Sequence, residues 1–120
     1  MQCPCNNVSD YSSCCEPLHF GLKEAKTAKE LMASRYSAYV QNELDYLLNT
    51  WHPSTRPKKL EKDETTLWRG LNIKHFGTHW VDFEAYYEKD GKLFIIAEKS
   101  EFYKDPKGHW LYLGAWKEAK

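Results

Sequence analysis

The stretch WVDFEAYYEKDGKLFIIAEKSEF, residues 80–102, decides the fold of this chain. Apolar side chains occupy alternate positions of residues 81–87, and residues 94–102 carry two phenylalanines, an isoleucine, a glutamate and a serine on one face. A period of two is typical of β-strands, and the intervening Asp90-Gly91 is typical of a tight hairpin turn. The stretch therefore predicts two antiparallel strands joined by a short turn.

Weaker alternations on both sides of this hairpin extend the predicted sheet. Leu71 and Ile73 alternate with polar residues before it, and Leu111 and Leu113 alternate with a tryptophan and a tyrosine after it. The last connector, residues 105–108, reads Asp-Pro-Lys-Gly, which is a turn composition. Because short connectors join neighbouring antiparallel strands, we expect a four-stranded meander.

Two helices are predicted ahead of the sheet. Thr27 and Glu30 form a capping box, and apolar residues recur at helical spacing from there to about Val40. A second, short helix is predicted over residues 44–51, and Pro53 should end it, because the residue before a proline is pushed out of the α region. Helices followed by a meander predict an α+β fold in which a curved antiparallel sheet packs over the helices.

Length and composition exclude several classes of protein. The chain has 120 residues, of which 42% are hydrophobic and 15% aromatic, so it has enough apolar material for one packed domain and too much for a disordered chain. Lys and Arg number 17, as do Asp and Glu, so nucleic acid is not expected as the main partner. No stretch approaches the roughly 20 apolar residues of a membrane span, so we expect a cytoplasmic protein without membrane contact.

All four cysteines fall near the start of the chain, in a segment with little apolar periodicity. Cys3, Cys5, Cys14 and Cys15 offer two close pairs of soft thiolates, the donor set of a structural, tetrahedral Zn²⁺. Disulfides are the alternative, but residues one or two apart are awkward to bridge, and a reducing cytosol disfavours them. His19 would enter the metal shell only if a cysteine were displaced. We therefore expect structural zinc in a closed shell.

The second strand of the hairpin carries candidate chemistry of another kind. Glu98 and Ser100 share a face with Phe102, so a carboxylate would point into a largely apolar pocket if that face is concave. Such a carboxylate is the starting point of an acid–base site. In the alternative, structural role, Glu98 accepts a hydrogen bond or an ion pair from Arg35 or Arg69. We favour the structural role, because the sequence places no histidine or second carboxylate beside Glu98.

Three further residues are assigned to this pocket. His52 precedes Pro53 at a helix end, where it either lines the pocket or caps the last carbonyls. Trp51 and the other tryptophans are expected in the core and the pocket lining and not stacked on bases, because acidic residues share the strands. Tyr36, on the apolar stripe of the first helix, completes the set.

With these residues in hand, the chain resembles the bacterial YchJ family over almost its whole length. The resemblance rests on Cys3-Pro4-Cys5, Cys14-Cys15, LMASRYSAYV at 31–40, DYLL at 45–48, TWHPS at 50–54, WRGL at 68–71, Glu98-x-Ser100-x-Phe102 and Trp110-x-Tyr112. It implies a SEC-C-type zinc knuckle in residues 1–20, with zinc on the four cysteines. It also implies a YchJ-like middle domain in residues 21–120, a cystatin-like or nuclear transport factor 2-like cone with a pocket. The family has no assigned biochemical function, so the resemblance implies a fold and not an activity.

Two functions of different classes follow from these observations. We expect a non-catalytic, zinc-binding cytoplasmic protein that binds a protein partner or a small apolar ligand. The alternative is a small hydrolase or isomerase that uses Glu98, assisted by His52 or Tyr36, inside the cone. A deep cavity in which Glu98 and His52 converge would favour the enzyme, and a filled core with an exposed aromatic patch would favour the binding module.

Overall fold

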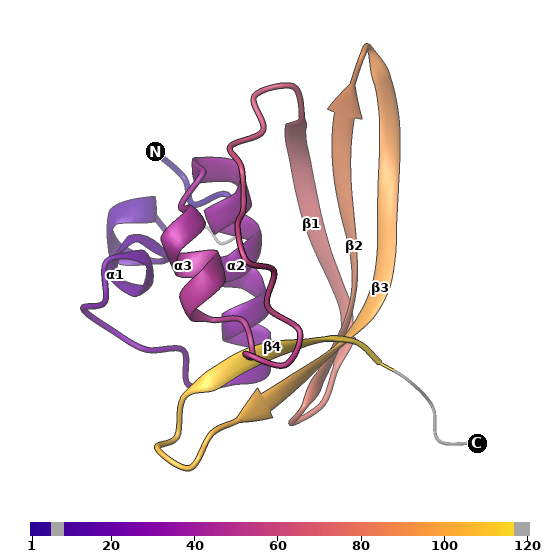
Figure 1. Ribbon diagram of the computed structural model, residues 1–120. Coiled ribbons are helices and arrows are strands. Elements are labelled where there is room, and N and C mark those ends of the chain that lie inside the picture. The colour runs from indigo at the N-terminus through magenta and orange to yellow at the C-terminus, as the bar shows by residue number, and fades with distance from the viewer. Residues whose placement is uncertain (6–8, 117–120) are drawn as a thin grey trace.

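Helices pack on one side of a curved, four-stranded sheet in the computed structural model, which describes residues 1–5 and 9–116 (Figure 1). The elements are η1 (Tyr11–Ser13), α1 (Glu16–His19), α2 (Ala28–Gln41), α3 (Leu44–Asn49), β1 (Leu67–Phe76), β2 (Trp80–Lys89), β3 (Lys92–Lys104) and β4 (Trp110–Ala115). This arrangement confirms the predicted α+β class. Among the described residues, no helix is long and apolar enough to cross a membrane.

The sheet is the predicted antiparallel meander, with strand order β1-β2-β3-β4. Lys89 of β2 pairs with Lys92 of β3. The two residues between them, Asp90 and Gly91, have positive φ values of 54° and 76°. A two-residue hairpin turn of type I′ requires such values at both positions, which explains the Asp-Gly sequence. The register also shifts within β1 and within the β3–β4 pairing, and such irregularities bend and twist a sheet.

Helix α2 begins and ends where its sequence signals place the boundaries. The hydroxyl of Thr27 accepts a hydrogen bond from the backbone N–H of Glu30 at 3.0 Å, which confirms the predicted cap. At the other end, Asn42 adopts the left-handed conformation with φ 57° and terminates the helix. The short helix α3 ends at Asn49, two residues earlier than expected and ahead of Pro53.

The core lies between α2 and the sheet. One face of α2 packs against the side of the sheet that faces the helices, and the side chains between them are buried. The buried cluster contains Ala28, Leu31, Met32 and Tyr36 of α2 together with Leu71, Val81, Phe83, Ala85, Phe102 and Trp110 of the strands. This filled layer is the main source of hydrophobic stabilisation in the cone.

The helices cover only part of the sheet. An α-helix rises about 1.5 Å per residue and a strand about 3.3 Å, so the 14 residues of α2 reach about half as far as the 13 residues of β3. Residues 92–97, at the start of β3, are all exposed, whereas Ser100 and Phe102 further along are buried. Figure 1 shows the β2–β3 hairpin extending past the helices.

Candidate functional site

A short antiparallel pairing at the start of the chain brings the two pairs of cysteines together. The backbone N–H of Cys3 donates to the carbonyl of Ser9 at 3.0 Å, and that of Tyr11 donates to the carbonyl of Met1 at 2.8 Å. The second cysteine pair follows in the turn between η1 and α1. The backbone therefore folds the first pair against the second without any large apolar core.

The four sulfurs form one cluster. All four Sγ atoms lie within 4.8 Å of one another, with 3.6 Å between Cys5 and Cys14 and 3.9 Å between Cys14 and Cys15. A tetrahedral Zn²⁺ with bonds of about 2.3 Å would separate its sulfur ligands by about 3.8 Å. No disulfide joins these cysteines, and Cys3 and Cys15 are each only 2% exposed. Donor type, number and spacing therefore fit a tetrahedral metal ion.

Without a bound metal, the thiols of this cluster are held in their neutral form. Burial raises the pKa of Cys14 to about 12, and its hydrogen bonds with Cys3 and Cys5 act in the same sense. The pKa of Cys15 is raised as well, first by a hydrogen bond with Cys5 and then by burial. Crowded, buried sulfurs do not ionise together without a neighbouring cation, and a bound divalent metal stabilises their thiolate forms.

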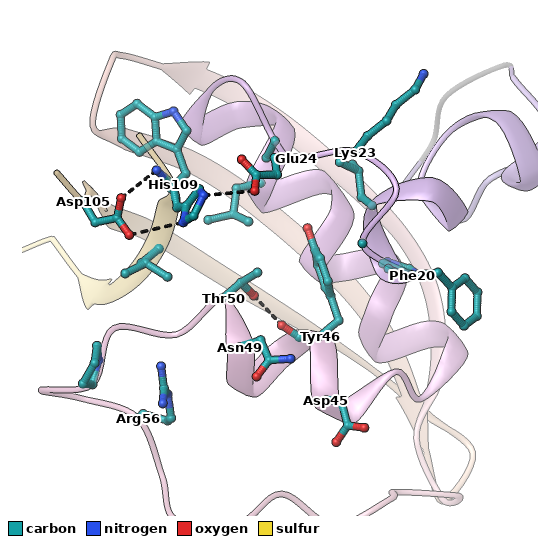
Figure 2. A pocket seen from close by; sticks show the side chains of 18 residues that line it. Phe20, Lys23, Glu24, Asp45, Tyr46, Asn49, Thr50, Arg56, Asp105 and His109 are labelled. Carbon is teal, nitrogen blue, oxygen red and sulfur yellow. Dashed lines mark hydrogen bonds and ion pairs between the residues drawn. The ribbon is translucent and has the colours of Figure 1, made fainter. Parts of the chain in front are cut away.

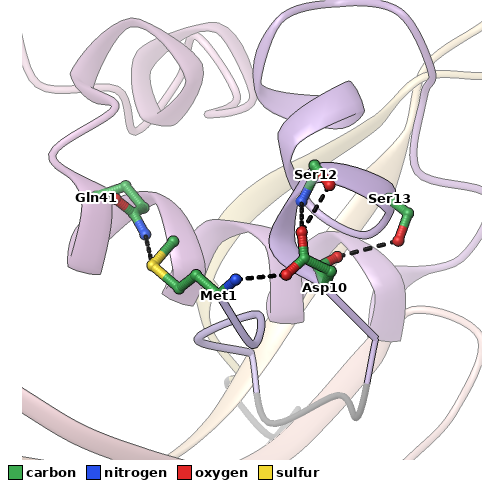
Figure 3. A network of polar contacts seen from close by, with 5 residues as sticks. All are labelled: Met1, Asp10, Ser12, Ser13 and Gln41. Carbon is green, nitrogen blue, oxygen red and sulfur yellow. Dashed lines mark hydrogen bonds and ion pairs between the residues drawn. The ribbon is translucent and has the colours of Figure 1, made fainter.

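Polar contacts fasten this segment to the end of α2 (Figure 3). The N-terminal amino group of Met1 contacts Asp10 Oδ1 at 2.5 Å, and Asp10 Oδ2 accepts from the hydroxyl of Ser12 at 2.6 Å. These hydrogen bonds hold the pKa of Asp10 at about 2. The side chain of Gln41 donates to the sulfur of Met1 at 3.9 Å. The chain start is thus tied both to η1 and to the last turn of α2.

The buried side chain of His19 makes a second connection between the start of the chain and α2. Its Nε2 lies 2.8 Å from the carbonyl oxygen of Ser34, and its Nδ1 lies 2.7 Å from the hydroxyl of Tyr11. Burial lowers the pKa of His19, so the neutral ring is favoured. Since a carbonyl can only accept, Nε2 carries the proton and Nδ1 accepts from Tyr11. His19 therefore links the cysteine segment, residues 1–5 and 9–19, to α2. The sequence did not predict this role.

The residues predicted around Glu98 come together in part. Ser100 and Phe102 are buried, as is Tyr36, and they belong to the filled part of the cone. Glu98 accepts hydrogen bonds through Oε2 from the hydroxyl of Ser100 and, at 3.3 Å, from that of Tyr112. The partners of Glu98 are therefore two hydroxyl groups, one on β3 itself and one on the adjacent strand β4.

The two arginines expected to hold Glu98 are engaged elsewhere. Arg69 pairs with Glu88 at 3.0 Å on the exposed face of the sheet. Arg35 is 3% exposed and donates through Nη1 to the carbonyl of Leu47 and the hydroxyl of Thr50, both at 2.7 Å. Its planar guanidinium also lies over two aromatic rings, which is a favourable position for a cation. Arg35 therefore joins α2 to the end of α3 and is not the partner of Glu98.

Trp51 and His52 point to different surroundings. The ring of Trp51 meets that of Tyr112 edge-on at 5.2 Å, and its Nε1 is the buried side-chain nitrogen without a hydrogen-bond partner in the described chain. His52 Nδ1 accepts from the backbone N–H of Ser54 at 3.0 Å, and the ring packs against Tyr103. Neither ring lines the pocket beside α3 and the β3–β4 turn.

That pocket lies where the cysteine segment, α3 and the β3–β4 turn meet, and it encloses about 740 Å³ (Figure 2). Leu18, Leu31 and Trp110 are buried residues among its lining. Charged side chains surround this apolar part. The lining comprises residues 18–21 and 23–25, Leu31, Asp45, Tyr46, Asn49, Thr50, Pro53, Arg56, Asp105 and residues 109–111.

One side of the pocket is closed by His109 of the β3–β4 turn. Its Nε2 lies 3.0 Å from a carboxylate oxygen of Glu24, and its Nδ1 lies 3.5 Å from one of Asp105. The backbone N–H of His109 donates to Asp105 at 2.8 Å, and this bond, more than any other contact, lowers the pKa of the Asp105 carboxyl. The sequence predicted only a turn at residues 105–108. The contact with Glu24 could not be predicted, because hydrophobic periodicity carries no information about contacts between distant parts of the chain.

Comparison with known proteins agrees with this architecture. Residues 27–115 match the family described as YchJ, middle NTF2-like domain. A UPF0225 protein of Xanthomonas campestris pv. campestris is 43% identical over 121 residues, which cover 94% of this chain and 92% of that protein. A UPF0225 protein of Deinococcus radiodurans is 38% identical over 114 residues, which cover 94% of this chain and 87% of that protein.

Two solved structures share the fold. The solution structure of a SEC-C motif containing protein from Rhodopseudomonas palustris superposes with a TM-score of 0.83 at 26% identity, over 99% of this chain and all of that one. The crystal structure of a SEC-C motif containing protein from Psychrobacter arcticus gives a TM-score of 0.76 at 27% identity, over 100% and 85% of the two chains. The chain therefore belongs to the YchJ (UPF0225) family, as its sequence motifs predicted.

Proposed function

We propose that this protein is a cytoplasmic binding module whose cysteine segment is held by one structural zinc ion. The observation that carries the proposal is the cluster of four sulfurs within 4.8 Å of one another. Four protein sulfurs complete a tetrahedral shell and leave no coordination position for a substrate, so the metal would be structural. Thiols that are not joined as disulfides suit the reducing environment of the cytoplasm.

The cysteine segment would contribute to binding by fixing the position of one wall of the 740 Å³ pocket. Leu18 and His19 belong to α1, directly after the cysteines, and both line the pocket. Because His19 bridges Tyr11 and the carbonyl of Ser34, the position of this wall depends on the cysteine segment. A metal-held segment can therefore order a binding site without taking part in chemistry.

The lining points to an apolar group as the occupant, carried by a small ligand or by a side chain of a protein partner. The buried side chains of Leu18, Leu31 and Trp110 offer apolar contact, and the charged rim would hold polar atoms attached to that group. We do not extend the proposal to catalysis by Glu98. The carboxylate of Glu98 already accepts hydrogen bonds from two hydroxyl groups, and Glu98 does not line this pocket.

Metal analysis of the purified, reduced protein tests the first part. We expect about one zinc per chain, because four thiolates form one closed shell. Cys14→Ser should lose most of this zinc, whereas Ser13→Ala, beside it in the chain, should keep it. A metal-free wild-type protein with intact thiols would contradict the proposal.

Binding of 1-anilinonaphthalene-8-sulfonate, an aromatic dye with one anionic sulfonate group, to the zinc-loaded protein tests the second part. Ala25 is half-buried and lines the pocket, so Ala25→Arg should fill the space and reduce the fluorescence gain. Leu22 is 80% exposed on the same linker and is outside this lining, so Leu22→Arg is the matched control. Equal dye binding by both variants would show that the pocket is not the binding site.

A further inference from the structure

An exposed apolar stretch at the start of β3 is not explained by the metal site or by the pocket. The side chains of Leu93, Phe94, Ile95 and Ile96 are 63%, 40%, 56% and 38% exposed. They follow one another on a strand, so they point alternately to both faces of the sheet. Four consecutive exposed apolar residues are uncommon on a strand of a protein that acts alone.

The same stretch is also an edge of the sheet. β4 pairs with β3 only over residues 100–104, while β2 pairs with β3 along its other side from Lys92 onward. The backbone N–H of Trp116 still reaches the carbonyl of Lys99, at 2.6 Å. In the described part of the chain, no strand lies on the outer side of residues 92–98. Their outward backbone groups therefore form a row of donors and acceptors that another strand can use.

Edge strands of this kind usually carry features that block pairing, and this one carries few. Residues 92–98 contain no proline and no glycine, and the register between β2 and β3 is regular throughout, without a bulge. Charged side chains occur only at the two ends of the stretch, at Lys92 and Glu98. The central five residues offer an uninterrupted apolar template.

We propose that a second copy of this chain pairs with residues 92–98 in antiparallel orientation, with the two-fold axis at Ile95. The two sheets would then join into one sheet of eight strands, with the helices of both copies on the same face. Phe94 and Ile96, left uncovered by α2, would meet the same residues of the partner across the axis.

Charge decides this register. In an antiparallel pair, residues directly opposite each other point to the same face of the sheet. The two-fold axis must therefore place one residue directly opposite the same residue of the partner, and we name the axis after that residue. An axis at Ile95 sets Lys92 opposite the partner's Glu98, and it does so twice by symmetry. An axis at Phe94 would set Asp90 opposite the partner's Glu98, two like charges. An axis at Ile96 would set Glu98 against the apolar ring of the partner's Phe94.

The contacts of Glu98 within its own chain are compatible with this pairing. Both of its hydrogen bonds, from Ser100 and from Tyr112, go to Oε2. Oε1 thus remains able to accept from the partner's Lys92. The side chain is half-buried, so it stands at the boundary between the covered and the uncovered part of the strand.

Sedimentation velocity of the zinc-loaded protein, over micromolar to millimolar concentrations, tests the proposal. We expect a monomer–dimer equilibrium, because seven residues of edge pairing form a small interface. Ile95→Lys should remain monomeric at every concentration and keep the wild-type circular dichroism spectrum, since the side chain is 56% exposed. Leu67→Lys is the matched control, with a 53% exposed side chain on β1 at the opposite edge, and it should dimerise as the wild type does.

Two results would overturn the proposal. One is a wild-type protein that stays monomeric throughout the concentration range. The other is a dimer that survives Ile95→Lys but is lost in Leu67→Lys, which would place the interface at β1.

Cross-linking tests the register separately. Under mild oxidation, Ile95→Cys should give a covalent dimer through the two introduced sulfurs, identified by peptide mapping, because residues on the axis face each other. Leu93→Cys should give far less, because Leu93 lies opposite the partner's Ala97. The reverse pattern would exclude an axis at Ile95.

Discussion

The cysteine segment and the cone of this protein are held together by different means. Among residues 1–5 and 9–19, the buried cluster consists of Cys3, Tyr11 and Cys15, with the other two cysteines packed beside it. The cone instead has a continuous core shared by α2 and all four strands. The difference shows that one chain can combine a short segment built around clustered sulfurs and polar contacts with a larger unit that relies on apolar burial. Each half should therefore respond to a different perturbation.

Removal of the metal should have the largest effect on this comparison. Structural zinc contributes on the order of 10 kcal/mol to the folding of small metal-bound segments, so a strong chelator should unfold the cysteine segment. The cone should remain folded, because its core contains none of the ligands. Amide hydrogen exchange measures both halves at once. Simultaneous loss of protection in β2 and in residues 9–19 would show that the two units fold as one.

A truncation in the core should have the opposite pattern. Phe102 is 2% exposed, and Phe102→Ala should lower the free energy of unfolding by about 3–5 kcal/mol. The zinc content of the folded protein should not change. Tyr103→Ala is the control on the same strand, since that side chain is 40% exposed, and it should cost less than about 1 kcal/mol. Denaturant titration measures both, and equal losses would contradict the assignment of the core.

His19 tests how strongly the two units are coupled. His19→Phe keeps a ring but leaves the carbonyl of Ser34 and the hydroxyl of Tyr11 without their partner, which should cost about 1–3 kcal/mol. The dissociation of zinc should also become faster, because the α1 end of the cysteine segment loses its attachment. A variant with wild-type stability and wild-type zinc kinetics would show that the units are independent.

The same residue gives a dependence on pH. Burial lowers the pKa of His19 in the folded state, so the unfolded state, with a pKa of about 6.5, binds the proton more readily. The stability contributed by His19 is therefore present above about pH 6.5 and decreases as the pH falls below that value. The stability difference between wild type and His19→Phe should narrow on acidification.

The smallest expected effect is at the start of α2. Thr27→Ala removes the hydroxyl that accepts from Glu30 and should cost about 1 kcal/mol, seen as a lower denaturation midpoint for the cone. Lys23→Ala, an exposed linker substitution, serves as the control. An unchanged midpoint for Thr27→Ala would mean that the cap does not limit the stability of the helix.

Local signals predicted the elements of this fold well. The Asp90-Gly91 turn, the Thr27 cap and the four alternating segments each depend on neighbouring residues, so their physical causes are present in the sequence. The clustering of the cysteines could also be anticipated, because two close pairs near each other have few ways to be arranged. Whether zinc occupies the cluster stays a prediction.

Tertiary packing decided the rest, because it depends on distances that periodicity does not contain. Phe94 and Phe102 share one face of β3, yet one is exposed and the other buried, since a helix advances less per residue than a strand and ends before it reaches Phe94. Arg35 or Arg69 was expected to meet Glu98, but Arg35 reaches the end of α3 and Arg69 pairs with Glu88. The pocket gathers a linker, a helix and a turn that are neighbours only in three dimensions. The sequence by itself determined which segments are helix and strand and that four cysteines lie close together in the chain. The tertiary structure decided which faces are covered, because coverage depends on where each element stops.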